Sequence, residues 1–245
     1  MRTHITGATG YLGSELARRR PDASTERVEV RDAEAVSRLL ERLRPDIVVH
    51  TAYRQDGPDA WEITVDGAEN VARAAAAVGA QLVHLSTDVV FDGRKTTPYV
   101  EDDTPAPVTG YGRAKAEAER RVSAANPEAL LVRTSLIYGG PKPSKHEKAA
   151  YDPQLRVYTN EIRCPVQVGD LASALLELAA LPVSGVLHVA GADAISRAEF
   201  AELVSRGAVA TAEAPPSRPL DCSLDSSRAQ LMIRTRLRGV REVVA

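Results

Sequence analysis

A glycine-rich turn near the start of the chain constrains the fold more than any other feature. The segment TGATGYLG, Thr6 to Gly13, follows a short β-type run, Arg2 to Thr6, and opens an amphipathic helical pattern. Gly7 permits a tight turn, Gly10 lets the backbone approach a pyrophosphate, and Gly13 allows the helix to lie close to the sheet. The helix N-terminus adds free N–H groups and a partial positive charge. This strand-turn-helix context predicts a dinucleotide site for NADP or NAD, with NADPH slightly favoured.

Beyond the turn, short apolar runs alternate with helical patterns. The runs end at His50, Ser86 and Thr134, and the helical patterns between them cover about Trp61 to Val78 and Tyr111 to Ala125. Strands separated by helices are the signature of βαβ units in a parallel sheet. We therefore predict an α/β fold, a doubly wound parallel sheet of the Rossmann type, with a small C-terminal substrate lobe.

The second half of the chain is less regular. Residues 138–160 contain three prolines and little periodicity, which predicts a long loop that covers a site. Regular patterns return as a helix over 170–181, a strand over 185–190 and a helix over 196–205. We expect one unit over 1–245, in which about 1–137 plus 162–190 form the dinucleotide-binding core and about 138–161 and 191–245 form the substrate lobe.

The composition of the chain limits the kinds of partner that it is expected to bind. The chain has 31 basic and 33 acidic residues, so there is no electrostatic reason to expect nucleic acid or an anionic membrane surface. No apolar run approaches the roughly 18 residues that span a bilayer, and the first residues enter a strand pattern without a signal peptide, which together suggest a cytoplasmic protein. Cys164 and Cys222 lie far apart, and His50, His84 and His188 sit in apolar strand patterns, so we expect no disulfide and no metal.

Recognition of the cofactor's ribose is less well defined. An acidic residue is usual about 20 positions after the glycine turn. The run RVEV, 27–30, is either the second strand, offering Glu29 or Asp32, or the third strand of a sheet that lacks the second. The run 18–20 of three arginines could meet a 2′-phosphate, although such a run at a helix end is more typical of a solvated face.

A tyrosine and a lysine supply the candidate chemistry. Tyr111 and Lys115 stand four apart at the start of a helix, one turn apart on the same face. An ammonium group beside a phenol lowers the pKa of the phenol. The tyrosine could therefore donate a proton to a carbonyl oxygen as hydride arrives. Ser86 and Thr87 end the preceding strand, where ligands bind in open α/β sheets.

Taken together, these motifs resemble the extended short-chain dehydrogenase/reductase family, and most closely its dTDP-4-dehydrorhamnose reductase branch. The resemblance covers most of the chain and rests on the order and spacing of six segments. They are TGATGYLG, RPDIVVHTA, LSTDVVFDG, YGRAK, RTSLIYG and CPVQVGDLA.

The resemblance implies a role for individual residues. Thr87 would orient the substrate oxygen, Tyr111 would donate the proton, and Lys115 would bind the nicotinamide ribose and depress the pKa of the tyrosine. Arg133 and Thr134 would lie near the nicotinamide. The cofactor-binding residues would be Gly7, Thr9, Gly10, Tyr11, Leu12, Gly13, Val30, Thr51, Ala52, Tyr111 and Lys115, and the substrate-contacting residues Val89, Leu136, Lys142 and Arg163.

Several positions depart from the branch. Val89 stands where it usually has tyrosine, Leu136 where it usually has tryptophan, and Asp66 where the family has a helix asparagine. These changes alter the sugar pocket while leaving Thr87, Tyr111 and Lys115, which favours a reductase with a different carbonyl substrate.

Other interpretations stay open. The same scaffold supports epimerisation or dehydration with tightly held NAD, and some relatives act as regulatory subunits. The loop 139–148 could grip an anionic substrate group or be a solvated basic loop. The helix that begins near Trp61 and the Tyr111 helix could form a homodimer surface, or simply cover the sheet.

Overall fold

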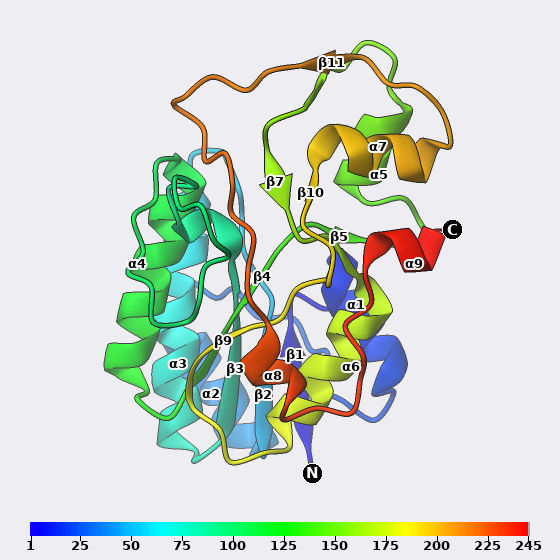
Figure 1. Ribbon diagram of the computed structural model, residues 1–245. Coiled ribbons are helices and arrows are strands. Elements are labelled where there is room, and N and C mark those ends of the chain that lie inside the picture. Colours follow the sequence, from blue (N-terminus) through cyan, green and yellow to red (C-terminus); the bar gives the residue numbers. More distant parts are fainter. Residues whose placement is uncertain (245) are drawn as a thin grey trace.

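A five-stranded parallel sheet forms the centre of the molecule (Figure 1). The structure is a computed structural model in which residues 1–244 are described. The strands lie in the order β1-β2-β3-β4-β9, with bounds β1 Thr3–Thr6, β2 Ile47–His50, β3 Gln81–Thr87, β4 Leu130–Thr134 and β9 Gly185–His188. Because all five are parallel, their carboxyl ends share one edge of the sheet, which is where a ligand binds in this architecture.

Helices cover both faces of the sheet, which confirms the predicted doubly wound α/β fold (Figure 1). Helices α2 (Ala33–Leu43), α3 (Gly67–Ala77) and α4 (Gly110–Ala125) cover one face, and α1 (Tyr11–Arg19) and α6 (Val168–Ala179) cover the other. Successive strand side chains divide between the two cores: Val83 packs on the α1–α6 side, and Leu82 on the α2–α4 side. Within residues 1–244, no helix has the length and apolar character needed to cross a membrane.

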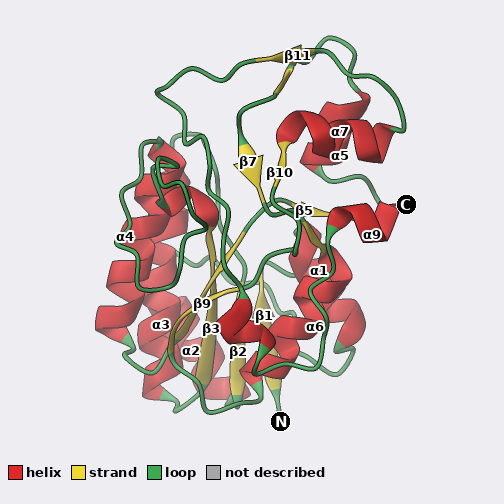
Figure 2. Cartoon of the chain, in the orientation of Figure 1, coloured by secondary structure: helices red, strands yellow, loops and turns green. Residues whose placement is uncertain are grey.

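A small lobe stands above the carboxyl edge of the sheet (Figure 2). We use "small lobe" for helices α5 (Lys145–Tyr151) and α7 (Arg197–Ser205) and for two strand pairs, β6 (Val157–Tyr158) with β11 (Thr211–Ala212) and β7 (Ile162–Arg163) with β10 (Ile195–Ser196). A third pair, β5 (Ile137–Tyr138) with β8 (Val166–Gln167), joins the lobe to the core.

The segment predicted as a loop over 138–160 contains helix α5, so that prediction is wrong in part. Ser144 caps this helix by accepting from the Glu147 N–H at 3.2 Å, and Glu147 accepts from the Ser144 N–H at 2.8 Å. This reciprocal capping box stabilises a helix that is too short to show a clear apolar period.

The run RVEV is in neither of the strands that were considered for it. Ser24, three positions before this run, bridges the free edge of β1: its carbonyl accepts from the Ile5 N–H at 2.9 Å, and its N–H donates to the Thr3 carbonyl at 2.8 Å. The chain then turns toward α2, so residues 27–30 have no strand to pair with. Val30 is buried against α3, where its side chain lies close to Gly67, and Asp32 caps α2.

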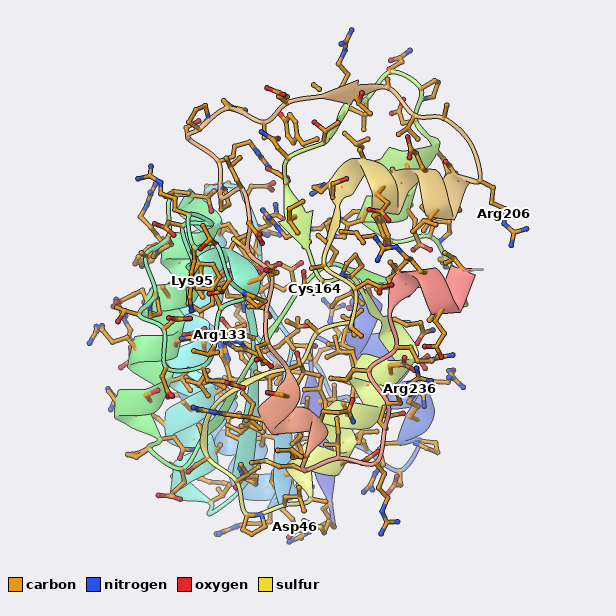
Figure 3. The ribbon with its side chains drawn as sticks, viewed as in Figure 1. Asp46, Lys95, Arg133, Cys164, Arg206 and Arg236 are labelled. Atoms are coloured by element: carbon orange, nitrogen blue, oxygen red, sulfur yellow. The ribbon has the colours of Figure 1, made fainter. Side chains whose placement is uncertain are left out.

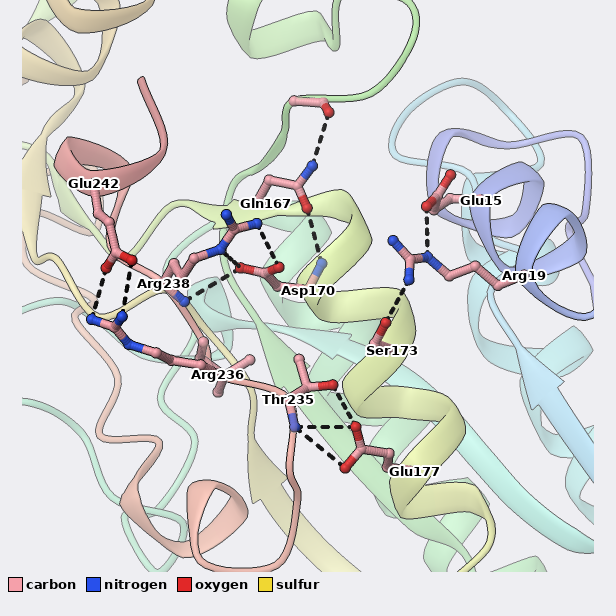
Figure 4. A network of polar contacts seen from close by, with 12 residues as sticks. Glu15, Arg19, Gln167, Asp170, Ser173, Glu177, Thr235, Arg236, Arg238 and Glu242 are labelled. Atoms are coloured by element: carbon pink, nitrogen blue, oxygen red, sulfur yellow. Dashed lines mark hydrogen bonds and ion pairs between the residues drawn. The ribbon is translucent and has the colours of Figure 1, made fainter. Parts of the chain in front are cut away.

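The C-terminal tail returns from the small lobe to the core (Figure 1), where its polar side chains contact helix α6 (Figure 4). Arg238 forms an ion pair with Asp170 of α6 at 2.9 Å, and Glu177 accepts from Thr235. Helices α8 (Ser227–Gln230) and α9 (Val240–Val244) lie in this tail. Its side chains Ala229, Ile233 and Leu237 belong to the main core, so the structure places much of 220–244 with the sheet and not with the lobe.

Candidate active site

A cleft of about 560 Å³ lies between the carboxyl edge of the sheet and the small lobe. Thr87 enters it from the end of β3, and Tyr111 and Lys115 enter it from the first turns of α4. Thr109 caps α4 by accepting from the Gly112 N–H at 3.0 Å, which fixes where the helix begins. The three residues predicted from the sequence to share a site are therefore brought together in one cleft.

Burial dominates the electrostatics of Tyr111 and Lys115. The Lys115 side chain is buried and its Nζ donates to the Leu85 carbonyl at 2.7 Å. Burial lowers the pKa of Lys115 to about 8, against an opposing effect of the Glu119 carboxylate. Burial also raises the pKa of Tyr111 well above its usual value, with Tyr53 and Asp88 adding to the effect. The phenol of Tyr111 is therefore protonated. The sequence predicts that the adjacent lysine lowers the pKa of this phenol, but the effect of burial is larger.

Asp88 is a buried carboxyl group that the sequence analysis did not single out. It follows Thr87 at the strand end, accepts from Thr87 Oγ1 at 3.2 Å and from Ser135 Oγ at 2.6 Å, and lies 3.7 Å from Arg163. Burial raises its pKa, and Arg163 opposes the shift. The carboxyl group therefore orders the hydroxyl of Thr87 and links it to the small lobe.

Tyr53, on the loop after β2, forms another wall of the cleft and was also missed. Its ring lies 5.7 Å from that of Tyr111 and covers the Lys115 ammonium at 5.2 Å. A signal was available, because Tyr53 follows Thr51 and Ala52 directly after a strand end. A cation over an aromatic face is stabilised there, so Tyr53 favours the charged form of the lysine.

The outer end of the cleft is cationic. The basic side chains that line it around the carboxyl group of Glu161 are Lys145, Lys148, Arg197 and Arg218. Arg163 also lines the cleft and lies nearer to Thr87, beside Asp88. Glu161 is fully buried, accepts from Arg218 Nε and lies 3.9 Å from Arg197 Nε. Lys145 donates to Gln55 across the cleft. Nothing in the local sequence marks Arg197 and Arg218, because tertiary packing of the small lobe brings them here.

The predicted substrate residues divide into two groups. Val89, Leu136 and Arg163 line the cleft, and Arg163 is fixed by donating to the Pro219 carbonyl at 2.7 Å. Lys142 is exposed and is not among the lining residues, whereas Lys145, one turn further along, is. Thr134 also lines the cleft, but the Arg133 side chain points away into a buried ion pair with Glu119.

The glycine-rich turn has the close contacts that its sequence predicts. Gly7 has φ +71°, and a Cβ there would lie 2.7 Å from the Ala52 nitrogen. A Cβ on Gly13 would lie 2.1 Å from the Gly7 carbonyl oxygen. Gly10 has no side chain to cap α1, so the first-turn N–H groups face outward as donors for a pyrophosphate. The turn therefore fits the diphosphate of a dinucleotide.

The other predicted cofactor residues surround this turn. Gly7, Thr9, Val30 and Ala52 line a pocket of about 200 Å³ beside it. The Tyr11 side chain lies in the main cleft. Thr51 donates to the Thr6 carbonyl at 2.8 Å, and the Leu12 side chain is in the core, so their side chains are structural.

The small pocket offers two charged groups to a ribose. Glu29 lines it and pairs with Arg31, which lowers the pKa of Glu29. Arg27 also lines it, is exposed, and has no hydrogen bond or ion pair to the rest of residues 1–244. The three arginines at the end of α1 are occupied elsewhere: Arg18 and Arg19 pair with Glu15, and Arg20 donates to the Met1 carbonyl at 2.8 Å.

The remaining histidines and cysteines lie in the interior. His50 stacks on His84 at 5.3 Å, and burial lowers the pKa of His50 to about 3. Cys164 is buried near the middle of the molecule (Figure 3). Cys222 is buried in the same hydrophobic cluster. Across residues 1–244, no three His, Cys, Asp or Glu side chains converge as a metal site requires.

Comparison with known proteins finds dTDP-4-dehydrorhamnose reductases both by sequence and by structure. The RmlD substrate binding domain family matches residues 1–244. The dTDP-4-dehydrorhamnose reductase of Mycolicibacterium smegmatis is 35% identical, over 90% of this chain and 72% of that protein. The methionine adenosyltransferase 2 subunit beta of Rattus norvegicus is 29% identical, over 91% and 80%. The structure of dTDP-4-dehydrorhamnose reductase from Bacillus anthracis in complex with NADP has a TM-score of 0.86 at 25% identity, over 99% of this chain and 96% of that one.

Proposed function

The chain belongs to the RmlD substrate binding domain family, and from this premise we propose that it reduces the keto group of a nucleotide-linked sugar. It is an NAD(P)-dependent reductase of the short-chain type. The observation that carries the proposal is that the two ends of its cleft differ in charge. A protonated phenol stands at the inner end, beside the glycine-rich turn, and cationic side chains from the small lobe stand at the outer end.

Tyr111 would act as the proton donor. Its buried phenol keeps its proton at neutral pH, as an acid must before the reaction. Thr87 would hold the substrate carbonyl oxygen, and Asp88, by accepting from Thr87, restricts how that hydroxyl can turn. Lys115 would hold the nicotinamide ribose and place its positive charge near the phenol as the proton leaves. A nicotinamide held there would supply the hydride for the carbonyl carbon.

The small lobe would bind the diphosphate that joins the sugar to its nucleoside. Arginine offers planar, paired donors that suit phosphate oxygens. Arg197 and Arg218 share a single carboxylate, Glu161, so the group as a whole stays positive. An anion at this end of the cleft would leave the sugar between Val89 and Leu136, on the way to Tyr111.

Reduction is tested by mixing the protein with NADPH or NADH and a panel of 4-keto sugar nucleotides, and following cofactor oxidation. Replacing Tyr111 by Phe should lower the rate at least about a hundredfold, because the proton donor is lost. The matched control is Tyr151→Phe, which removes the hydroxyl of an exposed tyrosine on α5. An unchanged rate in Tyr111→Phe would overturn the assignment.

A regulatory role is a second candidate, favoured by the similarity to a methionine adenosyltransferase subunit. Such a protein would keep the dinucleotide turn and have no chemical need for a proton donor. Cofactor binding with no turnover on the panel, together with a change in the activity of a partner enzyme on mixing, would support it. Co-purified NAD with no net oxidation of added cofactor would point instead to an epimerase or a dehydratase.

A further inference from the structure

A buried carboxylate lies one helical turn beyond the lysine of the site. Tyr111, Lys115 and Glu119 follow at intervals of four on α4, so they lie along one face of the helix. The Glu119 side chain is 6% exposed. It accepts from Arg133 Nη2 at 2.8 Å and Nε at 3.1 Å, and from Ser86 Oγ. Its oxygens are thus fully engaged below the cleft.

The partners of Glu119, which are Ser86 and Arg133, are also fixed by the surrounding structure. Arg133, labelled in Figure 3, lies in the interior of the molecule. It is paired in register with Ser86 across β3 and β4, and its side chain is 4% exposed. Its guanidinium lies 5.0 Å from the Phe91 ring. Ser86 stands between Leu85, whose carbonyl accepts from Lys115, and Thr87. The cluster of Ser86, Glu119 and Arg133 therefore clamps α4 to β3 beside the lysine.

Glu119 is the carboxylate one helical turn beyond Lys115, and its charge acts on the lysine through space. From β2 and β3, His50 and His84 face the lysine, and burial lowers the pKa of both, so they are neutral at pH 7. Tyr53 and Tyr111 are neutral as well, since burial raises both of their pKa values.

The other carboxylates around α4 have partners of their own. On the α3 side, Asp66 and Glu69 pair with Arg121. At the end of β3, Asp88 pairs with Arg163. Glu119 is paired too, with Arg133, but it lies one helical turn from Lys115 on the same face of α4, and its charge raises the pKa of the lysine.

We propose that Glu119 is a positioning residue for Lys115: its carboxylate holds the buried lysine in the ammonium form, and Arg133 sets how strongly it does so. The catalytic importance of this electrostatic effect rests on the proposed function, whereas the effect itself does not. An ammonium in this place can bind ribose hydroxyls and stabilise the phenolate that forms at Tyr111. A neutral amine binds ribose hydroxyls less strongly and stabilises the phenolate less.

Removing Glu119 and removing Arg133 should shift the pKa of Lys115 in opposite directions. Burial lowers the pKa of Lys115, and the Glu119 carboxylate raises it. Glu119→Gln removes the negative charge and leaves the Arg133 cation, so the pKa of Lys115 should fall. Arg133→Gln leaves the carboxylate without its neutralising partner, so the pKa of Lys115 should rise. A purely structural ion pair would predict loss of stability in both variants, with no opposed shifts.

The pKa of Lys115 can be measured directly, without substrate. The sequence has five lysines, at 95, 115, 142, 145 and 148, so their side-chain Cε signals are few enough to follow by NMR on the whole chain. Loss of one signal in Lys115→Arg assigns it. We expect the titration midpoint of Lys115 to fall by about one to two pH units in Glu119→Gln and to rise in Arg133→Gln.

Controls separate the electrostatic role from a folding defect. Glu117→Gln removes a carboxylate from the same helix that pairs with Arg120 and Arg121, and should leave the midpoint unchanged. If Glu119→Gln does not fold, the double variant with Arg133→Gln removes both buried charges, and its midpoint should still lie below that of the wild type. An unmoved midpoint in the folded Glu119 variant, or shifts of the same sign in both single variants, overturns the proposal.

The outcome is distinguishable from failure of the proposed function. If the protein reduces no keto sugar, the NMR midpoints still test the role of Glu119. If Tyr111→Phe abolishes reduction while the midpoints do not move, the proposal about Glu119 fails alone. With an active enzyme, the alkaline limb of kcat/KM should follow the NMR midpoint in each variant.

Discussion

The hydroxyl of Tyr11 connects the glycine-rich turn to Glu147 of the small lobe. It donates to Glu147 Oε2 at 3.3 Å and accepts from the Gly140 N–H at 2.7 Å. Tyr11 stands at the start of α1, where the pyrophosphate is expected, and Glu147 belongs to the capping box of α5. The cofactor turn and the helix that lines the substrate end of the cleft therefore share one hydrogen-bonded joint.

Tyr11→Phe should loosen this joint. The Gly140 N–H loses its partner, and the loss of one such bond corresponds to about a fivefold effect on binding. We expect KM for the sugar substrate to rise by about that factor with kcat little changed. Steady-state kinetics will show this, with Tyr151→Phe as the control. A KM equal to that of the wild type would mean that the joint does not order the substrate end.

Arg27 should decide between the two cofactors. It is an exposed cation in the small pocket, without a partner among residues 1–244, so it is free to meet a 2′-phosphate. Arg27→Ala should weaken NADPH binding by about tenfold and leave NADH binding nearly unchanged. Titration calorimetry with each cofactor measures both constants. Arg38→Ala, on the exposed face of α2, is the control, and equal losses for both cofactors would contradict the assignment.

Arg197 should contribute to substrate binding and not to the chemical step. Replacing it by Leu removes a cation from the outer end of the cleft, where it lies 3.9 Å from Glu161. The expected result is a rise in KM for the sugar nucleotide of about tenfold or more, with the Kd of NADPH unchanged. A matching variant at Arg206, which is exposed at the end of α7, should have no effect. A loss confined to kcat would place Arg197 elsewhere in the mechanism.

The rate of reduction should fall above about pH 8. Burial lowers the pKa of Lys115 to about 8, so the ammonium is present below that pH and is lost as the pH rises through it. The pKa of Tyr111 is raised well above its usual value, so the tyrosine does not account for this limb. Measuring kcat/KM for the cofactor from pH 6 to pH 10 tests this, as that parameter reports on groups of the free enzyme. In Lys115→Arg the limb should disappear from this range.

Gly7→Ala should strongly destabilise the protein. At φ +71° a side chain is strained, and its Cβ would lie 2.7 Å from the Ala52 nitrogen, which is backbone and cannot move aside cheaply. We expect a loss of more than about 2 kcal/mol in the free energy of unfolding, measured by urea denaturation. Gly207→Ala meets no atom within 4 Å and should change stability little. Similar stability of the two variants would show that the turn has relaxed.

The sequence predicts the sheet and the inner end of the cleft because their signals are local. Short apolar runs alternate with helical patterns, and Thr87, Tyr111 and Lys115 each lie at a recognisable strand end or helix start. The run 27–30 looks equally like a strand. It is not one, because Ser24 has already paired with β1 and the chain turns away. A local pattern does not show whether a neighbouring strand is available.

The outer end of the cleft could not be predicted in the same way. Arg197 and Arg218 lie in segments without a motif, and they converge through strand pairs of two residues each. Glu119 and Arg133 read as ordinary charges on a helix and a strand, and only their packing shows that they are buried. Helix α5 could have been predicted from the sequence, because Ser144 and Glu147 have the spacing of a capping box.

The pairing of Ser24 with the edge of β1 has a consequence for how this architecture can vary. The stretch that replaces a full strand and its connection lies at the rim of the sheet, next to β1, whereas Thr87, Tyr111 and Lys115 are carried by β3 and α4, further in. We therefore expect changes of length at the rim to leave the reacting groups in place. For protein engineering, residues 24–29 are the segment in which we expect exchange to alter the cofactor preference, whereas Val30 must stay because it is buried against α3.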